Sequence, residues 1–127
     1  MSKLRVNEVE NLANDGSLNF MGNYDVILPL GVYSSGSFTI PSGRTWADYD
    51  SIAVLHSRNA GAATCGPTTI ATREFLALNP TSFSIVNQSE SGALSSVNAT
   101  SATAFTVTVS GDDVIRQIIG YRKNGVA

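Results

Sequence analysis

The sequence predicts an all-β protein, a single antiparallel β-sandwich of the jelly-roll type with an extended N-terminal arm. Apolar and polar residues alternate in many short runs, which is the pattern of strands with one buried face. Turn-forming Gly, Asn, Asp and Pro residues separate these runs. Small polar residues also outnumber charged ones, since the 127 residues include 16 Ser, 11 Thr and 10 Asn and only 14% are charged.

The alternating runs mark individual strands. Each carries apolar side chains at every second position, so one face of each strand is expected to enter the core. Together with the runs described next, they predict about eight to ten short strands, as in sandwiches and jelly rolls. The runs and their inward residues are 37–40 with Phe38 and Ile40, 82–85 with Phe83 and Ile85, and 105–109 with Phe105, Val107 and Val109.

Two further runs, residues 51–56 and 114–119, are apolar on both faces. This pattern is typical of central strands, or of strands that a neighbouring subunit covers. The sequence Ser-Gly-Asp-Asp at residues 110–113 is a turn signal. We expect it to form a hairpin that joins the strand 103–109 to the strand 114–122.

The N-terminal segment differs from the rest of the chain. Residues 4–13 fit either a short helix or an extended arm, and the alternation of Leu4 and Val6 with polar neighbours favours the arm. The expected organisation is a docking arm over residues 1–22 and a β-sandwich head over residues 23–127. A head of this size can bury a sizeable core without a disulfide or a metal ion.

Two segments within the head break the alternation. Residues 58–68 are rich in Ala and Gly, and we expect a mobile surface loop there. Residues 69–78 fit either one helical turn or a strand, and their branched Thr and Ile residues favour the strand. No internal repeat, coiled-coil heptad or long linker interrupts the head.

The net charge, the length of the apolar runs and the cysteine count each exclude a class of protein. The formal net charge is -2, so the basic stripe of a nucleic-acid binder is missing and no nucleic-acid partner is expected. The longest apolar run, residues 26–30, is far too short to insert into a membrane. A single cysteine, Cys65, excludes an intrachain disulfide. Without an apolar signal core near Met1, we expect synthesis in the cytoplasm.

Catalytic and metal-binding chemistry has little support in the sequence. The sole histidine, His56, and the sole cysteine, Cys65, could form a dyad, but a strand histidine and a loop thiol with no shared task are the simpler interpretation. A structural zinc site needs about four His or Cys ligands. We therefore expect no enzyme activity, no metal and no cofactor. The acidic pairs that lack the spacing of a calcium loop, and that we interpret as turn residues, are Asp48 with Asp50 and Asp112 with Asp113.

The segment 44–50 is the candidate binding site. It holds the sole tryptophan, and aromatic faces beside Arg and Asp side chains are suited to contact a sugar. The favoured alternative is that Trp46 plugs one end of the sandwich. A further alternative is a small glycan-active hydrolase that uses Asp48 and Asp50 as its two carboxylates. The candidate glycan-binding residues are Arg44, Trp46, Asp48 and Tyr49.

Both ends of the chain resemble a known family. Residues 2–11, Ser-Lys-Leu-Arg-Val-Asn-Glu-Val-Glu-Asn, and residues 14–20, Asn-Asp-Gly-Ser-Leu-Asn-Phe, resemble the opening of small tail-fibre and related virion proteins of tailed bacteriophages. Residues 114–122 are similar to the closing strand of phage fibre heads. The resemblance implies a trimeric β-sandwich head without enzymatic activity. The repetitive shaft and adaptor domain of long fibres do not fit in 127 residues.

The resulting hypothesis is a non-enzymatic structural protein on the tail or capsid surface of a virion. It is a short trimeric tail fibre or fibre head that contacts a host surface glycan, or alternatively a capsid or tail decoration protein. The expected docking residues of the arm, which are apolar and would contact other virion proteins, are Leu4, Val6, Val9, Leu12 and Phe20.

The last strand predicts a subunit partner, and the resemblance to phage fibre heads implies three copies. A strand that is apolar on both faces needs cover twice, and a two-layer sandwich covers each sheet once. The chain has no amphipathic helix for the second cover, so a subunit partner is expected, and cyclic symmetry is the common arrangement. The residues predicted near the subunit axis, unless the opposite face of the strand is used, are Ile115, Ile119 and Tyr121.

Overall fold

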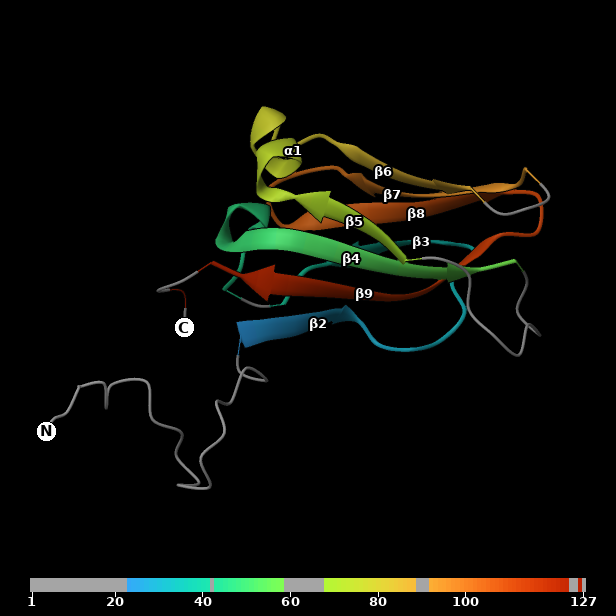
Figure 1. Ribbon diagram of the computed structural model, residues 1–127, viewed down its shortest axis with the longest axis horizontal. Helices are drawn as coiled ribbons and strands as arrows, with labels where there is room; N and C mark the ends of the chain where they lie inside the picture. The colour runs from blue at the N-terminus through green and yellow to red at the C-terminus, as the bar shows by residue number, and fades with distance from the viewer. Residues whose placement is uncertain (1–22, 42, 59–67, 89–91, 124–125, 127) are drawn as a thin grey trace, which may run out of the picture.

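Over the residues that the structure describes, the protein is a sandwich of two four-stranded antiparallel sheets (Figure 1). A computed structural model describes residues 23–41, 43–58, 68–88, 92–123 and 126. One sheet has the strand order β2-β9-β4-β5 and the other β3-β8-β7-β6, which confirms the predicted all-β sandwich. The strands are β2 (Tyr24–Leu28), β3 (Ser35–Thr39), β4 (Tyr49–Ser57), β5 (Thr68–Thr72), β6 (Ser84–Gln88), β7 (Leu94–Ala99), β8 (Ala104–Ser110) and β9 (Val114–Arg122).

The predicted hairpin between the last two strands is wrong. β8 pairs with β3 and β7 in one sheet, whereas β9 pairs with β2 and β4 in the other. The turn at residues 110–113 therefore carries the chain across the sandwich. Its last residue, Asp113, is buried. The burial of this side chain requires the chain to enter the space between the sheets at this point.

The two runs that are apolar on both faces are β4 and β9, and they are the inner strands of their sheet. They pair along their whole length, from Tyr49 opposite Arg122 to Ser57 opposite Val114. Their assignment as central strands is confirmed.

A β-bulge in β9 changes which side chains share a face. Leu55 of β4 lies opposite Gln117 and His56 lies opposite Ile115, so Arg116 is an extra residue with no β4 residue directly opposite it in the register. Ile115 therefore points into the core, where its exposure is 0%. The predicted grouping of Ile115 with Ile119 and Tyr121 is wrong, because strict alternation fails at the bulge.

The ambiguous segment 69–78 contains both alternatives. β5 ends at Thr72, and the helix α1 (Arg73–Leu78) follows it directly. Thr and Ile, which are branched at Cβ, make up most of the strand, and residues without a branched Cβ form the helix, in keeping with their propensities. The predicted arm over residues 1–22 and most of the predicted loop, residues 59–67, lie outside the described residues.

Candidate functional surfaces

The segment predicted to bind a sugar instead closes one end of the sandwich. The 3₁₀ helix η2 (Trp46–Asp48) places the Trp46 ring against Phe83 and Phe105, with ring centroids 5.1 and 5.6 Å away. Its indole nitrogen donates to the Ser101 carbonyl at 3.1 Å. Trp46 is 0% exposed and Tyr49 is 1% exposed. The prediction that these aromatic faces contact a glycan is wrong, and the alternative that Trp46 plugs the end is confirmed.

Arg44 and Tyr49 belong to a charged cluster at this same end. The Tyr49 hydroxyl and the Arg44 Nε each donate to Oδ2 of Asp25 at 3.0 Å. Arg122 Nη1 lies 3.7 Å from the other carboxylate oxygen. Burial raises the pKa of Tyr49, and the hydrogen bond to the Asp25 carboxylate raises it further. Asp25 and Arg122 are far from residues 44–50 in the sequence, so only the pairing of β2 with β9 could reveal them.

The two carboxylates of the hydrolase alternative have structural partners. Oδ2 of Asp48 accepts a hydrogen bond from the Thr45 backbone N–H at 2.8 Å and so caps η2. Oδ1 of Asp50 accepts a bond from Arg73 Nε at 2.7 Å and ties β4 to the start of α1. Both oxygens thus serve the local fold.

The other end of the sandwich holds a buried polar cluster that sequence reasoning missed. The Asp113 carboxylate lies 3.1 Å from His56 Nδ1 through each oxygen, and it accepts a hydrogen bond of 2.5 Å from the Ser95 hydroxyl. Asn87 Nδ2 donates to that hydroxyl oxygen at 3.2 Å, while its own Oδ1 is buried without a protein partner. The cluster joins β4 to β6 and β7, and so connects the two sheets.

The roles of the residues in and beside this polar cluster differ from those that the sequence predicted. Asp113 is a buried hydrogen-bond acceptor, whereas Asp112 is exposed and pairs with Arg58 at 3.3 Å. Ser95 donates to the carboxylate and not to the imidazole, so the cluster lacks the order of a serine-protease triad. Cys65 lies outside the described residues. Within the described ranges, no group of three His, Cys, Asp or Glu side chains could hold a metal ion.

The outer face of the sheet β3-β8-β7-β6 carries mainly hydroxyl and amide groups, with the exposed Val86 and Leu94 toward its β6 edge. The Ser96 and Thr108 hydroxyls are 2.6 Å apart, and Asn98 donates to both. The Ser84 hydroxyl donates to Asn98 Oδ1 at 2.8 Å. Aligned positions on the three strands β6, β7 and β8 thus bond to one another. We call this surface the polar face, and it consists of Ser35, Ser37, Ser84, Ser96, Asn98, Thr106 and Thr108.

The outer face of the sheet β2-β9-β4-β5 has the opposite character. One row of paired residues crosses all four strands and is entirely apolar, and the neighbouring row begins with two tyrosines whose rings lie 6.2 Å apart. Ile119 and Tyr121, two of the predicted interface residues, belong to this surface. We call it the apolar face, and it consists of Val26, Ile119, Ala53 and Ile70 in one row, with Tyr24, Tyr121 and Leu55 beside it.

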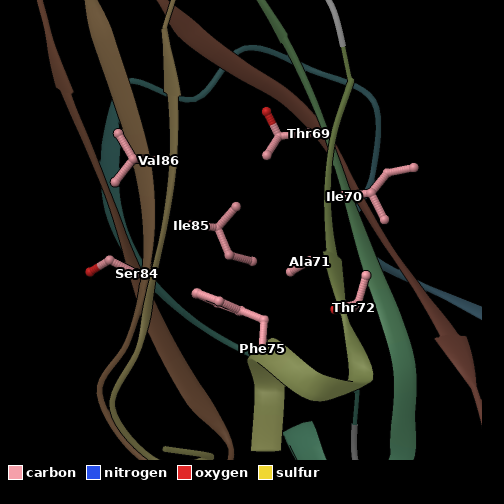
Figure 2. A pocket seen from close by; sticks show the side chains of 8 residues that line it. All are labelled: Thr69, Ile70, Ala71, Thr72, Phe75, Ser84, Ile85 and Val86. Atoms are coloured by element: carbon pink, nitrogen blue, oxygen red, sulfur yellow. The ribbon is translucent and has the colours of Figure 1, made fainter. Parts of the chain in front are cut away.

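Shallow grooves run between the edge strands of the two sheets. One of about 240 Å³ lies between β5 and β6 and is lined by Ala71, Phe75 and Ile85 (Figure 2). Another of about 560 Å³ lies between β2 and the strands β3 and β8. Figure 2 shows Ile85 pointing into the space between the sheets, while Ile70 and Val86 point away from it on opposite sides.

Comparisons with known proteins add no relative. No family model, no curated protein sequence and no solved structure matches this chain. Among the described residues, no helix has both the length and the apolar character needed to cross a bilayer. The function must therefore be argued from the surfaces.

Proposed function

We propose that this chain is a non-enzymatic structural protein of a bacteriophage virion, a short trimeric tail fibre or fibre head. The observation that carries the proposal is the difference between the two outer faces of the sandwich. An apolar face is suited to assembly, because its burial is favourable. A face whose hydroxyl and amide groups bond to each other is suited to the medium.

In this proposal the polar face is turned toward the host and contacts a surface glycan. It replaces the segment 44–50 as the contact surface, because the aromatic side chains of that segment are buried. Residues 1–22 form the docking arm that contacts other virion proteins. The resemblance of residues 2–20 and 114–122 to phage virion proteins supports this placement.

A decoration protein of the capsid or tail is the second candidate. The same two faces favour it, since a decoration protein also needs one surface for assembly and one for the medium. The hydrolase alternative is weaker, because Asp48 and Asp50 are engaged in structural contacts. Incubation of the protein with the host glycan should release no new reducing ends, and release that Asp48→Asn abolishes would support the hydrolase.

The location of the protein tests the proposal. Particles of the phage that encodes this chain would be labelled with gold-coupled antibody raised against the purified protein, with pre-immune serum as the control. Label at the tail is the expected result. Label distributed over the capsid would favour the decoration protein, and absence of the chain from purified particles would contradict both candidates.

Binding to host cells tests the glycan contact separately. The double variant Ser96→Ala/Thr108→Ala removes two hydroxyls of the polar face that bond to each other. We expect it to weaken binding to host cells, whereas Arg73→Ala on the exposed surface of α1 should bind normally. Equal binding by both variants and the wild type would remove the polar face from the proposed contact.

A further inference from the structure

We infer that the apolar face binds the same face of a second copy of this chain. The inference rests on the proposed trimeric assembly and deepens it, since it names the surface through which subunits meet. It differs from the sequence-based expectation, which grouped Ile115 with that surface. Ile115 belongs to the core.

The central row of this face is continuous across the sheet. Val26 of β2 pairs with Ile119 of β9, which pairs with Ala53 of β4, which pairs with Ile70 of β5. In antiparallel sheets, directly paired residues project to the same side, so the four side chains form one line. Ile70 is 62% exposed and Val26 is 44% exposed, although both are β-branched residues suited to a covered sheet.

The charge of the face favours a copy of itself. The three rows that form this face contain Tyr, Val, Ile, Ala, Leu, Ser, Thr and Gln and no charged residue, because the paired Asp25 and Arg122 lie in rows that face the core. Two such faces can meet without like-charge repulsion and without burying an unpaired charge. Residues 1–22, the other occupant that the chain itself offers, include Lys3, Arg5, Glu8 and Glu10. Those charges would find no partner on this face.

The size of the face agrees with the centre of a subunit interface. Four strands at about 4.8 Å spacing and three paired rows give a surface of roughly 20 by 20 Å, or about 400 Å². A standard interface buries about 800 Å² on each partner. The apolar rows would therefore form its centre, and polar surface around them would form the rim, as in most interfaces.

Matched substitutions at the two sheet edges test this inference. Ile70 on β5 and Val86 on β6 are both β-branched, outward-pointing residues of an edge strand, with exposures of 62% and 55%. Only Ile70 belongs to the apolar face. Full-length wild type, Ile70→Asp and Val86→Asp would be compared by light scattering at micromolar concentration, with circular dichroism to confirm folding.

We expect the wild type and Val86→Asp to have a mass of two or three times the 13.4 kDa of one chain. Ile70→Asp should dissociate to a folded monomer, with a subunit dissociation constant raised more than about tenfold. In the assembled state the interface would bury its carboxylate against an apolar surface, which is unfavourable. Val26→Asp, at the opposite end of the row, should dissociate in the same way. Agreement of these two variants would support the face whether the assembly is a trimer or a dimer.

Three results would overturn the inference: a monomeric wild type, an Ile70→Asp variant with the wild-type mass, or equal dissociation of Val86→Asp. The outcome is separable from that of the proposed function. A monomer that is found in virions would remove the subunit interface and leave the virion role. If the protein assembles through this face but is absent from virions, the virion role would be removed and the subunit interface would remain.

Discussion

The two ends of the sandwich both place a carboxylate between the sheets, but they stabilise it differently. At the end next to α1, which we call the arginine end, Asp25 lies among two arginines and a tyrosine and keeps 18% side-chain exposure. At the opposite end, which we call the histidine end, Asp113 is 0% exposed and contacts His56 and Ser95. One end balances charge with charge, and the other relies on hydrogen bonds out of contact with water.

This difference shows where the sandwich is sensitive to change. Charged groups that retain some access to water are screened, so loss of one contact is partly compensated. A fully buried carboxylate and its partners have no such compensation, because every donor and acceptor left without a partner is also cut off from water. The histidine end should therefore tolerate substitution less well than the arginine end.

The largest effect is expected for Asp113→Ala at the histidine end. It removes the acceptor of the Ser95 hydroxyl and of His56, and each buried donor that is left without a partner costs about 1–3 kcal/mol of unfolding free energy. Urea denaturation followed by circular dichroism measures it. The neighbouring Asp112→Ala, in an exposed pair, should cost less than about 1 kcal/mol.

Asp113→Asn tests the same point if the alanine variant does not fold. The amide keeps the size of the side chain but offers one acceptor in place of two, so a smaller loss than for Asp113→Ala is expected. Equal stability of Asp112→Ala and Asp113→Ala would contradict the comparison of the two ends.

An intermediate effect is expected for Gly120→Ala at the arginine end. A Cβ at this position would lie 2.6 Å from Tyr49 Cε1 and 2.9 Å from Ile27 Cδ1. Overpacking of this kind costs about 1–3 kcal/mol, measurable as a lower urea midpoint. Gly43→Ala is the control for backbone strain alone, since Gly43 has a φ of 83° and open space around it. A loss no larger than that of Gly43→Ala would show that the arginine end can rearrange.

The smallest effect at neutral pH is expected for Tyr49→Phe, which removes one of three contacts to Asp25. A loss of about 1 kcal/mol is expected, because Arg44 and Arg122 remain near the carboxylate. Thermal denaturation at pH 7 and across the alkaline range would measure both this loss and its pH dependence.

The pH dependence has a defined sign. The pKa of Tyr49 is raised in the folded state, so above the ordinary tyrosine pKa of about 10 the unfolded chain releases a proton that the folded chain retains. Wild-type stability should therefore fall as the pH rises beyond about 10, and Tyr49→Phe should fall less steeply. Parallel curves for the two proteins would contradict the raised pKa.

The sequence predicted the parts of the fold that depend on local pattern. Alternation identified the strands, and apolar residues on both sides marked β4 and β9 as central. The turn at residues 110–113 was mistaken for a hairpin because a turn signal does not specify which sheet the next strand joins. The polar clusters were missed because their members, such as His56 and Asp113, are far apart in sequence. Trp46 was identified as important, but only its packing shows that it closes one end of the sandwich and does not contact a sugar.

The bulge at Arg116 has a consequence for how the chain length can vary. It allows Ile115 and Ile118 to face the core across an interval of three residues. Deleting one residue at position 116 would restore simple alternation and keep every later side chain on its present face, at the loss of the Arg116 bond to the Gly31 carbonyl. The same deletion two residues further on would exchange Ile119 and Tyr121 with the core side. Among chains of this fold, insertions and deletions in β9 should therefore collect at the bulge.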